Sequence, residues 1–235
     1  MSHIAENIKA VEAKISAAAQ RSGRKREDIL LLAVSKTQTV EVIQQAVECG
    51  LTSLGENKVQ EIMDKYEPMG ESVHWHLIGH LQTNKVKYVV DKVDMIHSVE
   101  SLKLANEIEK RAAAKGVVMD ILVEVNIANE ESKFGISPKE AETFIRELST
   151  KEHLRVRGLM TVAPFVENSE ENREYFRQMR QLQVDINGKK IDNIVMDVLS
   201  MGMTGDYEVA IEEGATIVRV GTGIFGERDY SNREK

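Results

Sequence analysis

Residues 29–34 read ILLLAV, six apolar residues in a row. A strand with one face in water alternates apolar and polar residues, so this unbroken run indicates a strand that is buried on both faces. A helical pattern that ends at Gly23 precedes the run, and a second one extends from Thr39 to Val47 and is closed by Gly50. A doubly buried strand between two helices is typical of a parallel sheet that helices cover on both sides.

The same alternation of short apolar runs and helical stretches continues along the whole chain. We expect strands at 29–34, 52–55, 75–79, 94–98, 117–126, 154–162, 193–201 and 216–221. Helical stretches separate them, one of which opens at Ser137, with Pro138 and Glu140 at the proline and capping-box positions of a helix start. These units predict a single-domain (β/α)8 TIM-type barrel over residues 1–235, with an open doubly wound sheet as the alternative.

The composition excludes several classes of protein. The chain has 235 residues and a net charge of −7, which argues against a general coat for nucleic acid. The one cysteine, Cys49, cannot form an internal disulfide, and we expect an inert, half-buried thiol in a reducing compartment. No run of ~18 apolar residues and no apolar signal core occur. We therefore expect a cytoplasmic protein without nucleic-acid or membrane partners, and a charged, mobile tail over 227–235.

Lys36 follows the first expected strand after a single serine. Active sites in barrels of this kind lie at the carboxyl ends of the strands. A lysine at the mouth of a buried strand loses hydration, which favours the neutral amine that attacks an aldehyde to form an imine. The alternative is a lysine whose ammonium group extends into solvent. The position alone leaves both interpretations open.

The seventh and eighth expected strands end in small loops that contain glycine. Residues 199–205 read LSMGMTG, and residues 221–223 read GTG. Barrels of this type often bind phosphate with the loops after these two strands. Glycine lets backbone N–H groups approach a phosphate closely, and the hydroxyls of Ser200 and Thr222 add donors. The pattern predicts a phosphate site, with ordinary turn formation as the alternative.

Arg219 interrupts the last apolar run, TIVRVG at 216–221. If its side chain faces the barrel interior, the buried charge needs a partner, which is either a bound ligand or the carboxylate of Asp197 on the neighbouring strand. His74 and His76 share one face of a strand, but no third ligand has suitable spacing, so we expect no metal site. Other polar residues at or near strand ends are expected to line the mouth or to cap helices and loops: Asn57, His80, Asn84 and Asn126.

Six longer segments occur in order along essentially the whole chain. They are AVSKTQ (33–38), GENKVQE (55–61), HLIGHLQTNK (76–85), EVNIANEESKFG (124–135), GLMTVAP (158–164) and LSMGMTGDYEVAIEEGATIVRVGTGIFG (199–226). Together they resemble the pyridoxal phosphate homeostasis protein family, which is similar in fold to the N-terminal barrel of alanine racemase. The length of these segments makes the resemblance specific, and it implies the barrel that the strand pattern predicts.

The resemblance implies that the chain binds pyridoxal 5′-phosphate. Lys36 would form a Schiff base with the cofactor, and Arg219 would face its pyridine nitrogen. Asn57 would lie beside the ring. The phosphate would be held by Ser200, Gly221 and Thr222.

We weigh three functions for such a protein. The favoured one is a cofactor carrier without robust catalysis, which governs vitamin B6 and amino-acid balance and passes the cofactor to apo enzymes. Arginine neither accepts a proton nor readily gives one up, so an Arg219 partner would weaken the cofactor as an electron sink. The second is an amino-acid racemase, although we expect this chain to lack the additional domain with which alanine racemase dimerises, and hence to be a monomer. The third is a phosphate-binding barrel enzyme without this cofactor.

Overall fold

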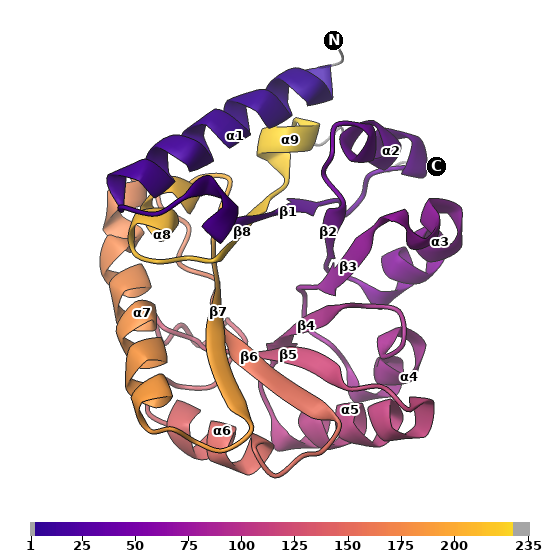
Figure 1. Cartoon of the computed structure of the whole chain (residues 1–235), viewed down its shortest axis with the longest axis vertical. Helices are drawn as coiled ribbons and strands as arrows, with labels where there is room; N and C mark the ends of the chain where they lie inside the picture. The colour runs from indigo at the N-terminus through magenta and orange to yellow at the C-terminus, as the bar shows by residue number, and fades with distance from the viewer. Residues whose placement is uncertain (1–2, 228–235) are drawn as a thin grey trace.

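In the computed structural model, which describes residues 3–227, the chain forms a closed barrel of parallel strands in chain order (Figure 1). The strands are β1 (Leu30–Val34), β2 (Ser53–Glu56), β3 (His74–Leu77), β4 (Met95–Val99), β5 (Met119–Glu124), β6 (Leu154–Met160), β7 (Ile194–Met203) and β8 (Ile217–Val220). Each strand pairs in parallel with the next, and β8 pairs with β1. The predicted TIM-type barrel is confirmed, and the alternative of an open sheet is wrong.

Helices cover the outside of the barrel (Figure 1). The α-helices are α1 (His3–Arg21), α2 (Val40–Glu48), α3 (Val59–Met69), α4 (Val86–Val89), α5 (Leu102–Lys115), α6 (Ala141–Leu148), α7 (Arg173–Gly188), α8 (Tyr207–Glu212) and α9 (Thr222–Phe225). Short 3-10 turns complete the connections: η1 (Arg26–Asp28), η2 (Gly70–Ser72), η3 (Thr83–Lys85) and η4 (Ser169–Asn172). The first helix, α1, packs against α8 and α9, so the two ends of the described chain lie together.

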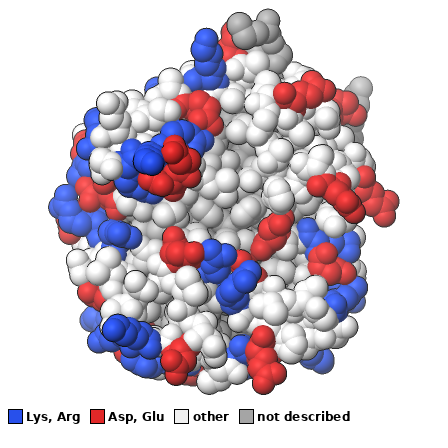
Figure 2. Space-filling view, in the orientation of Figure 1, with Lys and Arg blue, Asp and Glu red and all other residues white. Residues whose placement is uncertain are grey.

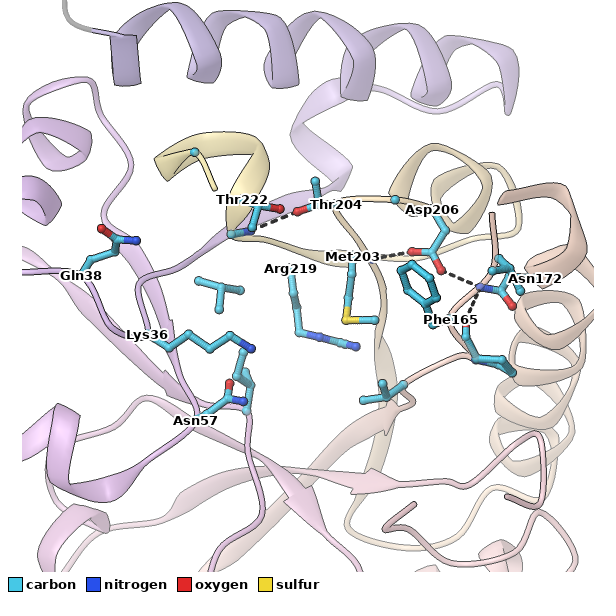
Figure 3. A pocket seen from close by; sticks show the side chains of 18 residues that line it. Lys36, Gln38, Asn57, Phe165, Asn172, Met203, Thr204, Asp206, Arg219 and Thr222 are labelled. Atoms are coloured by element: carbon cyan, nitrogen blue, oxygen red, sulfur yellow. Dashed lines mark hydrogen bonds between the residues drawn. The ribbon is translucent and has the colours of Figure 1, made fainter. Parts of the chain in front are cut away.

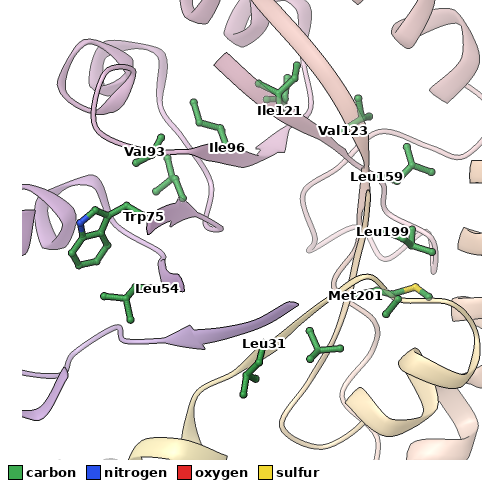
Figure 4. Close-up of a cluster of buried hydrophobic side chains, with 14 of the residues drawn as sticks. Leu31, Leu54, Trp75, Val93, Ile96, Ile121, Val123, Leu159, Leu199 and Met201 are labelled. Carbon is green, nitrogen blue, oxygen red and sulfur yellow. The ribbon is translucent and has the colours of Figure 1, made fainter. Parts of the chain in front are cut away.

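The central residues of β1, Leu31 to Ala33, are all apolar because their side chains enter two separate apolar layers. Leu32 faces the barrel interior and is fully buried there. The other members of this interior cluster are Met95, Leu122, Met160 and Ile217. Leu31 belongs instead to the layer between strands and helices, which also holds Trp75 (Figure 4). Each large apolar side chain buried in either layer stabilises the fold by about 1.5–3 kcal/mol.

The carboxyl end of β7 differs from the expectation. We expected this strand to end at 201, but it continues to Met203. Its pairing with β6 is irregular beside Gly158, whose backbone closely approaches that of Val198. A Cβ at Gly158 would lie 1.8 Å from the Val198 carbonyl oxygen, so only glycine permits this approach. The extension of β7 changes which residues reach the mouth of the barrel.

The remaining expectations about the chain concern the helix after Ser137, membrane-spanning segments and the tail. The helix expected from Ser137 begins at Ala141, although the backbone N–H of Ser137 does donate to Glu140 Oε2 at 3.2 Å. Within residues 3–227, the helices are too short or too polar to cross a membrane. The tail that we expected to be mobile lies, after Glu227, outside the described residues. Acidic and basic side chains are intermixed around a largely uncharged centre on the face shown in Figure 2.

Candidate functional site

A cavity of about 510 Å³ opens at the carboxyl ends of the strands (Figure 3). Most of the residues that we predicted for the site line it: Lys36, Asn57, Arg219, Gly221 and Thr222. The pairing of β1 with β8 explains this grouping, because Leu32 lies opposite Arg219 and Ala33 lies opposite Val220. The residues that follow these pairs therefore reach the mouth of the barrel side by side. Ser200 is the one predicted site residue that does not line the cavity.

The rim formed by the loops after β7 and β8 carries hydroxyl groups and backbone N–H groups. Thr204 Oγ1 accepts the N–H groups of Gly221 and Gly223, each at 3.4 Å, and so ties the two loops together (Figure 3). Gly205 and Thr222 line the cavity beside it. A Cβ at Gly205 would meet nothing within 4 Å, so the rim borders open space. Because Thr204 Oγ1 accepts these two bonds, its hydroxyl proton remains available, and together with the Thr222 hydroxyl it suits a phosphate group.

Thr204 is a site residue that the sequence analysis missed. It stands in the glycine-bearing segment that we singled out, but we placed the end of the strand at 201 and so chose Ser200 as the hydroxyl at the rim. Because β7 extends to Met203, Thr204 is the first residue beyond the strand and lines the cavity. Ser200 lies within the strand and is fully buried.

Arg219 projects from β8 into the barrel and is 4% exposed. One terminal nitrogen of its guanidinium donates to Ser200 Oγ at 2.8 Å, and the other donates to the Thr161 carbonyl at 2.7 Å. Burial lowers the pKa of Arg219 to about 10, against the opposing effect of Asp206 and Glu124. The guanidinium is therefore still charged at neutral pH and forms part of the cavity wall.

Asp197 is not the partner of Arg219, contrary to one of our two expectations. Its carboxylate is exposed and accepts two hydrogen bonds from Arg157, at 3.0 and 2.6 Å. Ser200 of β7 pairs with Ile217 of β8 and Met203 pairs with Arg219, so Asp197 lies toward the amino end of the barrel, away from Arg219. The buried guanidinium relies on neutral oxygen atoms instead.

A chain of neutral side chains continues from Arg219 across the barrel. Ser200 Oγ lies 3.1 Å from His97 Nδ1, and His97 Nε2 lies 2.9 Å from His76 Nδ1. Burial lowers the pKa of His76 to about 4. Burial is also the main reason why the pKa of His97 lies well below its usual value, and the nearby His76 and Arg219 lower it further. Both rings are therefore neutral at physiological pH.

The guanidinium fixes one end of this hydrogen-bond chain. Arg219 can only donate, so Ser200 Oγ accepts from it, and the Ser200 hydroxyl proton stays available for His97 Nδ1. In the tautomer that carries its proton on Nε2, His97 accepts from Ser200 and donates to His76 Nδ1. We infer that Ser200 supports Arg219 from below, a position that does not fit the phosphate contact we expected of it.

The opposite wall of the cavity is held by Asp206 and Asn172. Asp206 Oδ1 accepts the N–H of Met203 at 2.7 Å, and its Oδ2 accepts from Asn172 Nδ2 at 2.8 Å. Asn172 Nδ2 also donates to the Pro164 carbonyl at 2.9 Å. These bonds join the loops after β6 and β7. Phe165, in the first of these loops, lines the cavity although it is 97% exposed.

The remaining polar residues named from the sequence lie outside the cavity lining. His80 Nδ1 lies 2.9 Å from Glu100 Oε1, and the His80 ring stacks on Phe134 at 4.1 Å. Asn126 holds its own loop by donating to the Glu130 carbonyl at 2.8 Å. Asn84 falls within η3, and His74 lies 3.2 Å from Asp94. Residues 3–227 contain no group of three His, Cys, Asp or Glu side chains that could hold a metal ion. Cys49 is exposed, which corrects the expectation of a half-buried thiol.

Glu124 is a buried carboxyl group at the end of β5. Its side chain is enclosed, and Oε2 has no hydrogen-bond partner among residues 3–227. Burial raises its pKa to about 7, the neighbouring charge of Glu100 adds to the rise, and the charge of Arg219 opposes it. Glu124 is thus a group inside the barrel that can change its charge near neutral pH.

Comparison with known proteins agrees with this geometry. The family described as alanine racemase, N-terminal domain, matches residues 6–229, which defines the broad class of the barrel. The pyridoxal phosphate homeostasis protein of Aquifex aeolicus is 46% identical over 226 residues, covering 96% of this chain and 98% of that protein. The protein of the same name from Escherichia coli K12 is 40% identical over 240 residues and covers 99% and 100% of the two chains. The chain belongs to the pyridoxal phosphate homeostasis protein family.

Solved structures show the same barrel. A protein described as unknown from Bifidobacterium adolescentis is 36% identical, with a TM-score of 0.90, over 94% of this chain and 94% of that protein. PipY of Synechococcus elongatus PCC7942, solved with pyridoxal phosphate bound, is 30% identical with a TM-score of 0.83, over 95% of this chain and 100% of PipY. Alanine racemase from Corynebacterium glutamicum shares only the fold, at 13% identity and a TM-score of 0.69, over 96% of this chain and 63% of the racemase.

The buried carboxyl of Glu124 predicts a pH dependence of stability. In the unfolded chain the pKa of a glutamate is about 4.3, so the folded chain binds this proton more tightly. The resulting stabilisation is present below about pH 4 and is lost as the pH rises through 7, by about 2–4 kcal/mol in total. We expect the free energy of unfolding, measured by urea denaturation, to fall more between pH 5 and pH 8 in the parent than in Glu124→Gln. The same pH dependence in both proteins would mean that Glu124 does not titrate in this range.

Proposed function

We propose that this chain binds pyridoxal 5′-phosphate covalently through Lys36 and serves in the homeostasis of that cofactor, as a carrier without robust catalysis. The observation that carries the proposal is the meeting of Lys36, Arg219 and the Thr204–Thr222 rim around one cavity. Two findings on relatives support it. The similar PipY structure contains pyridoxal phosphate, and relatives at 40–46% identity are named for its homeostasis.

The residues present fit the cofactor in size and in chemistry. The cavity of about 510 Å³ lies within the range of roughly 300–1,000 Å³ that is usual for small-molecule sites. It offers an amine for an aldehyde and hydroxyl and N–H donors for a phosphate. It also offers a fixed cation, Arg219, to a ring nitrogen. A phosphate-binding barrel without this cofactor would leave the amine and the buried cation without a role.

Each residue of the cavity has a separate task in this proposal. Lys36 holds the cofactor by a Schiff base with its aldehyde, and Asn57 lies beside the ring. Arg219 faces the pyridine nitrogen. The phosphate is held at the rim by Thr204, Gly221 and Thr222. Ser200, which we first expected at the phosphate, acts here by fixing Arg219 through the 2.8 Å hydrogen bond.

Arg219 argues for a carrier and against an efficient enzyme. Bound pyridoxal phosphate supplies an electron sink, which is strongest when its ring nitrogen is protonated. A charged guanidinium cannot accept a proton, and its positive field disfavours a second positive charge nearby. Burial lowers the pKa of Arg219 only to about 10, so the positive field persists at neutral pH. The site therefore retains the cofactor while giving weak support to carbanion chemistry.

A racemase remains the alternative function, and the described cavity offers it little. Racemisation needs acid or base groups on both faces of the substrate carbon. Besides Lys36 and Arg219, the ionisable group lining the cavity is Asp206. Both of its carboxylate oxygens accept hydrogen bonds, from Met203 and Asn172, which occupy it in holding the wall. Residual activity through Lys36 alone is compatible with a carrier.

In this proposal the protein works in the cytoplasm as a monomer. Its partners are the cofactor and apo enzymes that depend on it. The mixture of charges over the face in Figure 2 gives no basis for binding nucleic acid. Membranes are likewise not partners in the proposal.

Lys36→Ala tests the covalent attachment. Loaded parent protein that is reduced with borohydride should carry the cofactor label on one peptide, the one that contains Lys36. Lys36→Ala should lose the label, because the neutral amine that attacks the aldehyde is gone. The exposed Lys58, which lies next to Asn57, gives the control Lys58→Ala, which should label like the parent. A parent that takes up no cofactor, or a Lys36→Ala variant labelled at another single lysine, contradicts the proposal.

A pair of hydroxyl deletions tests the division of labour between Thr204 and Ser200. Removing one hydrogen bond to a charged group costs about 1.5–3 kcal/mol, which is roughly tenfold or more in affinity. Thr204→Val should weaken pyridoxal 5′-phosphate by this factor and leave unphosphorylated pyridoxal nearly unchanged. Ser200→Ala should weaken both ligands alike, because it releases Arg219 rather than the phosphate. Fluorescence titration gives the four affinities, and a phosphate-selective loss in Ser200→Ala would return Ser200 to the phosphate.

A further inference from the structure

Side chains of α3 hold the two peptide groups that flank Lys36. On one side, Lys65 Nζ donates to the carbonyl oxygen of Ser35 at 2.9 Å. On the other side, Glu61 Oε2 accepts the backbone N–H of Thr37 at 2.6 Å. One helix therefore grips the chain immediately before and immediately after the residue that reaches into the cavity.

The gripping side chains belong to one buried charged network. Lys65 Nζ lies 2.7 Å from Glu56 Oε1 and 3.0 Å from Glu61 Oε2, and Ser35 Oγ donates to the same Glu56 oxygen at 2.7 Å. Glu56 is fully buried and Lys65 is 7% exposed. Burial raises the pKa of Glu56, against the effect of Lys65. Burial alone would also raise the pKa of Glu61, but its bonds to Thr37 and Lys65 lower it.

Such a network is costly to bury, so its placement calls for an explanation. Buried ion pairs rarely stabilise a fold more than apolar side chains of similar volume would. Their attested use is to specify one arrangement of the chain. The arrangement specified here is that of β2, α3 and the turn after β1, which contains Lys36.

Thr37 shows that this turn is constrained. Its φ is 66°, in the left-handed region that β-branched residues rarely adopt. The side chain is exposed, so packing does not impose this conformation. Two hydrogen bonds hold its backbone: the Thr37 N–H donates to Glu61, and the Gln38 N–H closes the turn by donating to the Ser35 carbonyl at 3.1 Å. Residues held in such conformations persist where the surrounding structure determines them, commonly at functional sites.

The geometry points to Glu61 and Lys65 as positioning residues for Lys36, which hold the turn 35–37 so that the Lys36 amine meets the aldehyde of the cofactor. Neither residue lines the cavity, so both act through the backbone and not through contact with the ligand. The inference rests on the proposed function, since it concerns how the covalent bond to Lys36 forms. It adds two residues outside the cavity to the apparatus for cofactor capture.

A purely structural role for the network is the competing explanation. If Glu61 and Lys65 only fasten α3 to the barrel, their loss lowers stability and affects every ligand of the cavity alike. If they position Lys36, their loss affects the ligand that reacts with the amine and spares one that cannot. The discriminating pair is pyridoxal 5′-phosphate and 4′-deoxypyridoxine 5′-phosphate, which carries a methyl group in place of the aldehyde.

The experiment compares both ligands on the full chain carrying Glu61→Ala. We expect the affinity for pyridoxal 5′-phosphate to fall at least about fivefold, since a hydrogen bond to a charged group is lost, while the deoxy analogue binds within about twofold of the parent. The rate of imine formation, followed by absorbance, should fall in parallel. Glu61→Gln keeps an oxygen acceptor for the Thr37 N–H and should recover most of the loss. Glu67→Ala, at an exposed site on the same helix, is the matched control.

The possible results separate the two explanations. Equal losses for both ligands, or no loss for either, overturn the positioning role. Should Glu61→Ala not fold, Glu61→Met removes the acceptor at similar side-chain length and is judged by the same two affinities. A parent protein that binds the deoxy analogue but forms no imine through Lys36 refutes the proposed function itself. A parent that forms the imine, with Glu61→Ala matching it, refutes only the inference.

Discussion

The pairing of β8 with β1 is the constraint on which the site depends. It closes the barrel and sets Leu32 opposite Arg219, in the register from Leu30 and Ile217 to Ala33 and Val220. Both strands then end at the same rim, so residues from opposite ends of the sequence meet around one cavity. A shift of one residue in this pairing would turn Arg219 from the barrel interior to the helix layer. Closure thus decides both the fold and the chemistry.

Two polar networks of different character support Lys36 and Arg219, the two side chains proposed to hold the cofactor. The network beneath Lys36 is charged and grips backbone, whereas the chain beneath Arg219 is neutral and holds the guanidinium itself. The difference has a physical reason. Arg219 already brings a buried charge. Ser200 accepts a hydrogen bond from it and His97 contacts Ser200, and because both are neutral they add no second buried charge. Rigid support of this kind holds reactive groups in place more firmly than the cavity residues could by themselves.

The sequence predicted those parts of the fold and of the candidate site that depend on local pattern, such as apolar runs and positions at strand ends. The barrel follows from the unbroken apolar run at 29–34 and its repetition. Their places at strand ends made Lys36 and Arg219 candidates, and the resemblance to a known family supplied their expected roles. We expected Ser200 at the rim because apolar periodicity does not fix where a strand stops, and the structure instead buries it within β7. The methionine-rich end of β7 continues to Met203, and the hydroxyl at the rim is that of Thr204.

The supporting networks could not be predicted in this way. The contact of His97 with Ser200 joins β4 and β7, across 103 residues of sequence, and that of His76 with His97 joins the consecutive strands β3 and β4. The grip of Glu61 and Lys65 on the Lys36 turn depends on how α3 settles against the barrel. Nothing in local spacing encodes such contacts, since they arise from strand register and helix orientation in the closed fold.

We propose that the site retains pyridoxal phosphate while Arg219 keeps the ring nitrogen of the cofactor unprotonated. Nitrogen-15 NMR of the labelled ring nitrogen in the loaded protein measures that protonation state directly. We expect an unprotonated nitrogen at neutral pH in the parent, and a shift toward the protonated form in Arg219→Glu, where the local field is reversed. A protonated ring nitrogen in the parent protein would contradict it.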